Sequence, residues 1–235
     1  MWRGGVDIEA GGKKPVAEEP PEHRWGFIRK VYIILSIQIF LTAGVAYAVV
    51  KIHPIQQFLT STPAGIVVQI LIIITPFIVL IGLCAYSEKH PVNHILLTIF
   101  TLSFALLVGL ACAHTKGEIV LEASILSGVV VTGLTLYTFW ATKRGLEFEF
   151  LGPFLFSATL VLIGFGLIQA FWPLGRLSRM IYSGLSAILY CGYIIYDTYK
   201  LIKRCSYDEY IWAVVSLYID VVGLFLGFLG IGNNI

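Results

Sequence analysis

Of the 235 residues, 57% are hydrophobic and only 13% are charged, whereas soluble domains average about 45–50% apolar and about 25% charged residues. This composition excludes an ordinary water-soluble domain. The net charge is only +2, and no basic stretch alternates with aromatic residues, so we expect no nucleic-acid partner.

The chain begins with a polar segment. Residues 1–26 contain five acidic residues and three prolines, and they lack the apolar core of a secretory signal. We therefore expect a disordered cytosolic tail, followed by one membrane domain over residues 27–235.

Seven apolar stretches follow, each close to the roughly 20 residues that a helix needs to cross the hydrocarbon core. Short gaps with Pro, Gly and charged residues separate them. The stretches cover residues 31–50, 64–86, 95–113, 122–141, 151–172, 180–199 and 211–231. The predicted fold is an all-α membrane protein, a bundle of seven transmembrane helices.

Basic residues predict the orientation, because Lys and Arg concentrate on the cytosolic side of a membrane. With the N-terminus in the cytosol, twelve of the 16 basic residues lie on the cytosolic side. The other side keeps four, which are Lys51, Lys116, Arg176 and Arg179. A cytosolic N-terminus is therefore favoured.

Two aspartates, Asp197 and Asp220, stand inside the last two stretches, away from their ends. An aspartate at mid-membrane costs about 2.5–3.5 kcal/mol, so it faces a bundle interior or a water-filled cavity. If the two stretches form a hairpin about Tyr207, the aspartates differ in depth by three residues, or about 4.5 Å of helix rise. We expect them to meet in the cytosolic half.

A stripe of small and polar residues indicates which way Asp220 faces. Ser216, Asp220, Gly223, Gly227 and Gly230 recur at intervals of three and four, so they share one helix face. Faces of this kind pack closely against neighbouring helices. Asp220 is therefore predicted to point into the bundle, with Ser216 and Gly223 as candidate pore-lining residues.

Two adjacent carboxylates in a medium of low polarity should share one proton and titrate together, which makes a proton sensor. When ionised they offer oxygen ligands to Ca²⁺, but fewer than the six to eight of a tight site, so transient passage fits better than storage. Alternatively, each aspartate only braces the bundle through a hydroxyl group of Thr198, Tyr196 or Tyr218.

The other polar candidates are weaker. Glu118, Glu122 and His114 cluster at the non-cytosolic ends of the third and fourth stretches, where they could line an entrance or only mark the interface. The four cysteines are widely spaced, without a metal-binding pattern. No nucleophile, general base or phosphate-binding motif is visible, so we expect neither an enzyme nor a cofactor.

Several motifs resemble the transmembrane Bax inhibitor motif family, and the plant Lifeguard branch in particular. Gly-Tyr-Ile-Ile-Tyr-Asp-Thr at 192–198 and Ser-Leu-Tyr-Ile-Asp-Val-Val-Gly-Leu-Phe-Leu at 216–226 look like its paired signature. Pro-Val-Asn-His-Ile-Leu-Leu at 91–97 and Glu-Phe-Glu-Phe-Leu-Gly-Pro-Phe-Leu-Phe at 147–156 are similar to two of its connections. The similarity covers about residues 24–230.

The resemblance implies seven helices, a pH-sensitive Ca²⁺ leak across an internal membrane such as the endoplasmic reticulum, Golgi or vacuole, or across the plasma membrane, and suppression of programmed cell death under stress. It places a di-aspartyl sensor at Asp197 and Asp220. Bacterial relatives latch this pair with an arginine of the second helix. That stretch has no arginine here, and Lys89 and His90 at its cytosolic end are the candidate latch.

Two hypotheses of function remain. In the first, the bilayer-embedded chain is a passive pathway for Ca²⁺ that the aspartate pair gates. In the second, it is a non-conducting scaffold whose partners are membrane proteins that regulate cell death. A coupled transporter is less well supported, because one Pro-interrupted helix lacks a counterpart in the other half.

Overall fold

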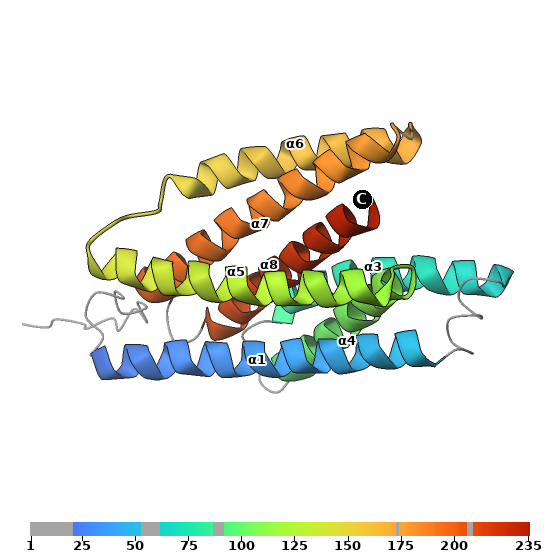
Figure 1. The fold of residues 1–235 in the computed structure, drawn as a ribbon. Coiled ribbons are helices and arrows are strands. Elements are labelled where there is room, and N and C mark those ends of the chain that lie inside the picture. The colour runs from blue at the N-terminus through green and yellow to red at the C-terminus, as the bar shows by residue number, and fades with distance from the viewer. Residues whose placement is uncertain (1–20, 53–61, 87–91, 173, 206–208) are drawn as a thin grey trace, which may run out of the picture.

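The computed structural model describes residues 21–52, 62–86, 92–172, 174–205 and 209–235. Within these ranges the secondary structure is helical, without strands. The helices are α1 (Pro21–Lys51), α3 (Pro63–Tyr86), α4 (Val92–Ala113), α5 (Gly117–Lys143), α6 (Leu151–Phe171), α7 (Arg176–Lys203) and α8 (Tyr210–Asn233), as Figure 1 shows. Each covers one predicted stretch, and α1 begins at Pro21, inside the predicted tail.

Six of these helices are long and apolar enough to cross a membrane: α1, α3, α4, α5, α6 and α8. The chain is therefore an integral multi-pass membrane protein. Helix α7 has the length, at 28 residues, but charged residues at both of its ends and several tyrosines make it less apolar. Its crossing remains a prediction.

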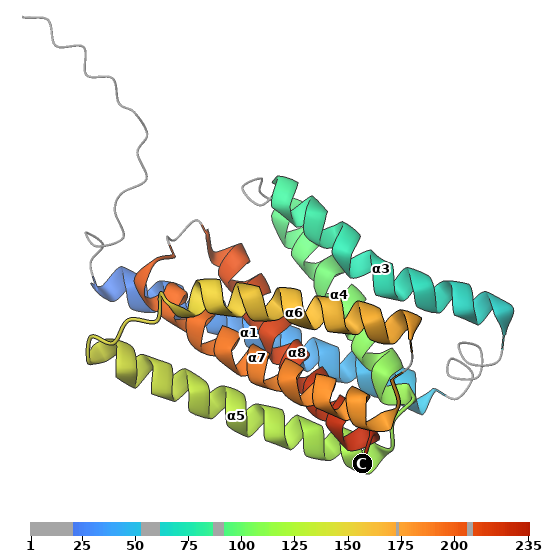
Figure 2. The same cartoon turned by 90° about the horizontal axis from the view of Figure 1, so that it is seen from above.

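Helix α8 occupies the centre of the bundle. It packs against α7, α1, α5 and α4, whereas α3 packs mainly on α4 and α6 mainly on α7 (Figure 2). Accordingly, 56% of the apolar window of α8 is buried, against 6% of the corresponding window of α6. The peripheral helices turn large apolar side chains such as Phe40, Phe154 and Phe171 outward, as lipid requires.

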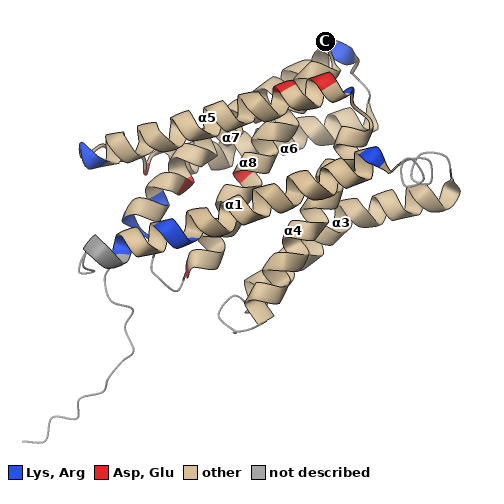
Figure 3. Ribbon diagram, turned by 60° about the horizontal axis from the view of Figure 1, so that its bottom comes forward, with Lys and Arg blue, Asp and Glu red and all other residues tan. Residues whose placement is uncertain are grey.

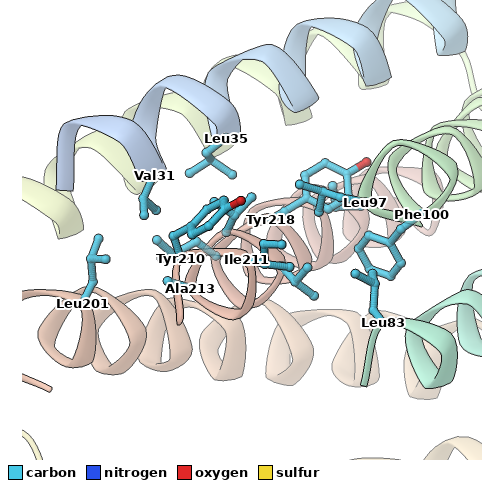
Figure 4. Packing of buried hydrophobic residues seen from close by; sticks show 14 of the residues in the cluster. Val31, Leu35, Leu83, Leu97, Phe100, Leu201, Tyr210, Ile211, Ala213 and Tyr218 are labelled. Atoms are coloured by element: carbon cyan, nitrogen blue, oxygen red, sulfur yellow. The ribbon is translucent and has the colours of Figure 1, made fainter. Parts of the chain in front are cut away.

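Buried apolar side chains of α1, α4 and α8 fill the centre of the bundle. Figure 4 shows Val31 and Leu35 of α1 and Phe100 of α4 around Tyr210 and Tyr218 of α8. Tyr218 and Phe100 are fully buried, and their rings meet edge to face with centroids 6.0 Å apart. This contact is part of the packing of α4 on α8.

The two ends of the bundle differ in charge (Figure 3). We call one the basic end, because it carries most of the described basic side chains, namely Arg24, Arg29, Lys30, Lys143, Arg144, Lys200, Lys203 and Arg204. Helix α1 begins there, and α5 and α7 end there. The opposite end carries Lys51, Lys116, Arg176 and Arg179 together with Glu118 and Glu122.

Candidate functional site

Helices α7 and α8 pack together through the predicted glycine stripe. A Cβ atom on Gly223 would overlap the Tyr190 ring, and one on Gly227 would lie 3.0 Å from the Cβ of Ala187. A Cβ on Gly230 would overlap the Ser183 hydroxyl group. The prediction that this stripe packs closely against a neighbouring helix is therefore confirmed, and the neighbour is α7.

The same antiparallel register leads to the two aspartates. From the contact of Gly223 with Tyr190 toward the basic end, Asp220 lies about one turn away on α8. Asp197 lies about two turns away in the same direction on α7. Side chains on a helix lean toward its N-terminus, so Asp197 leans away from the basic end and Asp220 leans toward it. The two carboxyl groups thereby converge and lie close enough to interact electrostatically.

The two members of the pair have different surroundings. Asp220 is 4% exposed, and in the described part of the chain its Oδ2 atom has no hydrogen-bond partner. The Asp197 side chain is 13% exposed, and its Oδ1 atom lies 3.6 Å from the Nζ atom of Lys200. The positive charge of Lys200 favours the ionised form of Asp197, while Asp220 has no cation of its own at salt-bridge distance among the described residues.

Lys200 is the basic residue that sequence reasoning missed at this site. Lys89 and His90, the candidate latch, lie outside the described residues. The signal for Lys200 was present in the sequence, because residues three apart on a helix are neighbours and Lys200 follows Asp197 by three.

The hydroxyl groups considered as braces do not bond to the aspartates. Tyr218 bonds instead to the Thr42 hydroxyl of α1 at 2.7 Å, and the Tyr196 hydroxyl packs against Gly152 of α6. The Thr198 hydroxyl lies near that of Tyr32 without completing a hydrogen bond among the described residues. These three hydroxyl groups therefore give no support to a bracing role for the aspartates.

A polar contact anchors α1 to α4. The Gln38 Nε2 atom donates to the Thr101 hydroxyl at 2.7 Å, and both residues are buried. Together with the Tyr218 to Thr42 bond, this contact holds α1, α4 and α8 in fixed orientation. Asp220 therefore sits on a central helix that hydrogen-bonds to α1.

The remaining predicted residues take other places. His114, Glu118 and Glu122 are exposed at the opposite end, and their role at an entrance stays a prediction. The Ser216 hydroxyl donates to the Trp212 carbonyl at 3.0 Å, and Gly223 lies under the Tyr190 ring, where it serves helix packing.

The aspartate pair can exchange protons, but it can bind a cation only weakly. Within the described residues, no group of three or more His, Cys, Asp or Glu side chains could hold a metal ion. A Ca²⁺ ion at the pair would meet two carboxylates and would keep much of its water shell, because Ca²⁺ takes six to eight oxygen ligands.

Comparison with known proteins places these features in a family. The family model described as inhibitor of apoptosis-promoting Bax1 matches residues 24–234. The chain is 56% identical to Protein LIFEGUARD 2 of Arabidopsis thaliana over 231 residues, which is 97% of each chain. It is 34% identical to Bax inhibitor 1 of Schizosaccharomyces pombe over 92% of this chain and 79% of that one. It is 33% identical to the Golgi anti-apoptotic protein of Vaccinia virus, over 91% and 87% of the two chains.

Proposed function

This chain is a plant Lifeguard-like member of the Bax inhibitor family, and on that premise we propose that it suppresses programmed cell death through a passive Ca²⁺ leak gated by Asp197 and Asp220. The printed names of relatives from fission yeast and a virus, which refer to Bax inhibition and to anti-apoptotic action, support the cell-death role. The leak and its gate are proposals from the family resemblance and from the geometry of the pair.

The gate rests on one observation, which is that two carboxyl groups face each other inside the bundle and one of them, that of Asp220, is only 4% exposed. Like charges that lie close together repel strongly in a low dielectric, so the two carboxyl groups favour a state in which they share one proton. Loss of that proton would drive the carboxylates apart, and with them the α7 and α8 helices that carry them. Proton concentration would thus control how tightly the two helices close.

The proposed orientation follows from the charges at the two ends. We place the basic end in the cytosol, because Lys and Arg collect there. Lys200, at 39% exposure, then links Asp197 to cytosolic water and so lets the pair respond to cytosolic pH. The membrane would be internal, such as that of the endoplasmic reticulum, Golgi or vacuole, or the plasma membrane.

Calcium flux into liposomes that contain the purified chain tests the gate. We expect a flux that changes with pH in the wild type, and a flat profile in Asp220→Asn, which cannot ionise at this position. Glu149→Gln is the matched control, because Glu149 is an exposed carboxylate paired with Arg204 at the basic end. An Asp220→Asn profile that overlays the wild type would remove the pair from the gate.

The alternative is a non-conducting scaffold that acts on membrane proteins of the cell-death machinery. A double variant, Asp197→Asn with Asp220→Asn, separates the two functions. Loss of both Ca²⁺ flux and protection of stressed cells supports the leak. Full protection by a double variant that conducts nothing supports the scaffold.

A further inference from the structure

Helices α1 and α5 run alongside each other, and large side chains lie between them at the basic end of the bundle. At the basic end the rings of Trp25 and Phe139 stack with centroids 6.1 Å apart, and Tyr32 lies 6.3 Å from the same Phe139 ring. Farther along, the α5 face toward α1 carries Gly117, Ser124 and Gly128. Large side chains thus fill one end of the contact, and small ones leave the other open.

The open part is a groove of about 600 Å³ bounded by α1, α4, α5 and α8. This volume falls in the range of about 300–1,000 Å³ that is typical of sites for small molecules. Gly128 and Ser124 are exposed, and nothing lies within 4 Å of a Cβ built on Gly128. The groove therefore opens sideways, toward the surrounding lipid.

The Ser and Thr residues in the walls of the groove offer no free hydrogen-bond donor. Each of the five lining Ser and Thr hydroxyl groups donates to a backbone carbonyl one turn earlier on its own helix, at 2.7–3.0 Å: Thr42, Thr115, Ser124, Ser127 and Thr132. The other described lining residues are apolar or small, apart from Tyr47 and Lys51. With no acidic residue among them, this groove suits a hydrocarbon chain and does not suit a cation.

The length of the groove matches one leaflet of a bilayer. On α1 it runs from Ile39 to Lys51, which is about 18 Å of helix. Half of a typical hydrocarbon core is about 15 Å. An acyl chain that lies along the groove would reach from the interface to the middle of the membrane.

Lys51 stands at the interfacial mouth of this groove. It is the last residue of α1, and it is the only charged residue among the described residues that line the groove. In the described part of the chain Lys51 forms no ion pair, and its Nζ atom lies 6.0 Å from the Tyr47 ring centroid. A cation without a carboxylate partner among the described residues, at the end of an apolar groove one leaflet long, complements a phosphate joined to an acyl chain.

We propose that the groove between α1 and α5 is a binding site for one phospholipid of the leaflet at the opposite end of the bundle. An acyl chain lies between α1 and the Gly128 face of α5, and the phosphate group lies on Lys51. A glycerophospholipid is the occupant, because it joins a hydrocarbon chain to an anionic phosphate, whereas a sterol carries no charge to complement Lys51. The site is separate from the aspartate pair and does not depend on any Ca²⁺ leak.

Native mass spectrometry of the purified full chain tests the site. The protein is incubated with dioleoylphosphatidylglycerol, or with dioleoylglycerol, which has the same chains and no phosphate. We expect the wild type to retain one phosphatidylglycerol and far less diacylglycerol. Gly128→Phe, which fills the groove, should abolish retention. Lys51→Gln should weaken phosphatidylglycerol binding about fivefold, since a Lys near the membrane surface attracts an anionic lipid by about 1 kcal/mol.

Gly133→Phe is the matched control. Gly133 lies on the same helix, is also exposed with open space around its Cβ, and does not line the groove. This variant should retain the lipid as the wild type does. Circular dichroism checks that Gly128→Phe is folded. If it is not, Ser124→Phe is a second variant that fills the groove. Equal retention by filled-groove and Gly133→Phe proteins, or equal retention of the two lipids by the wild type, would overturn the proposal.

Discussion

The close approach of α7 and α8 at Gly227 leads to a prediction with an unusual sign. Exchange of an exposed helical Gly for Ala normally stabilises a protein, by about 0.4–1 kcal/mol. At Gly227 the new methyl group would lie 3.0 Å from the Cβ of Ala187 and 3.1 Å from its backbone N and Cα atoms. Ordinary contacts are 3.4–4 Å, so the two helices would have to move apart.

Overpacking of this kind costs about 1–3 kcal/mol, which exceeds the gain in helix propensity of about 1 kcal/mol. Gly227→Ala should therefore destabilise the protein by up to about 2 kcal/mol. At about 2–4 °C of Tm for each kcal/mol, the melting temperature should fall by several degrees. The matched change Gly133→Ala meets open space and should raise Tm slightly.

A double-mutant cycle identifies the cause. Ala187→Gly removes the nearest of the three clashing atoms and leaves the two backbone atoms in place. Added to Gly227→Ala, it should therefore recover part of the lost stability, although Ala187→Gly alone is destabilising. Thermal unfolding in detergent, followed by tryptophan fluorescence, measures all four proteins. Strictly additive effects of the two changes, or a Tm of Gly227→Ala equal to that of Gly133→Ala, would refute this account of the contact.

Three further predictions concern single side chains. Tyr218→Phe removes the 2.7 Å bond to Thr42, whose hydroxyl group still donates to the Gln38 carbonyl. The free energy of unfolding, measured by chemical denaturation, should therefore fall by only about 0.6–1 kcal/mol. A loss above about 3 kcal/mol would contradict this reasoning. Lys200→Gln removes the cation 3.6 Å from Asp197, which makes ionisation of the aspartate pair harder. The pH midpoint of Ca²⁺ flux should therefore move upward. A downward shift would exclude the contact. Burial raises the pKa of the Cys205 thiol to about 11, so in a variant with Cys205 as the only cysteine, alkylation should be slow at pH 7 and should rise nearly tenfold for each pH unit up to about 11. A plateau below pH 9 in that alkylation profile would show an accessible thiol.

Much of this architecture could be predicted from the sequence, because lipid imposes strict local rules. A backbone in hydrocarbon must form helices, so apolar stretches of about 20 residues located each helix in the chain, although α1 begins at Pro21, well before the predicted start at residue 31. The interval pattern of Gly223, Gly227 and Gly230 predicted a closely packed face, since periodicity on a helix is a local property. Counting from the hairpin placed the two aspartates at similar depth.

Only the tertiary structure decided which surfaces meet. No local signal states that Tyr190, Ala187 and Ser183 cover the stripe, or that α8 is the central helix. The choice of Lys200 as the cation beside Asp197 depends on side-chain direction as well as on spacing. The groove between α1 and α5 arises because aromatic rings join these helices at one end and small residues face each other at the other, and that pairing exists only once both helices are packed on α8.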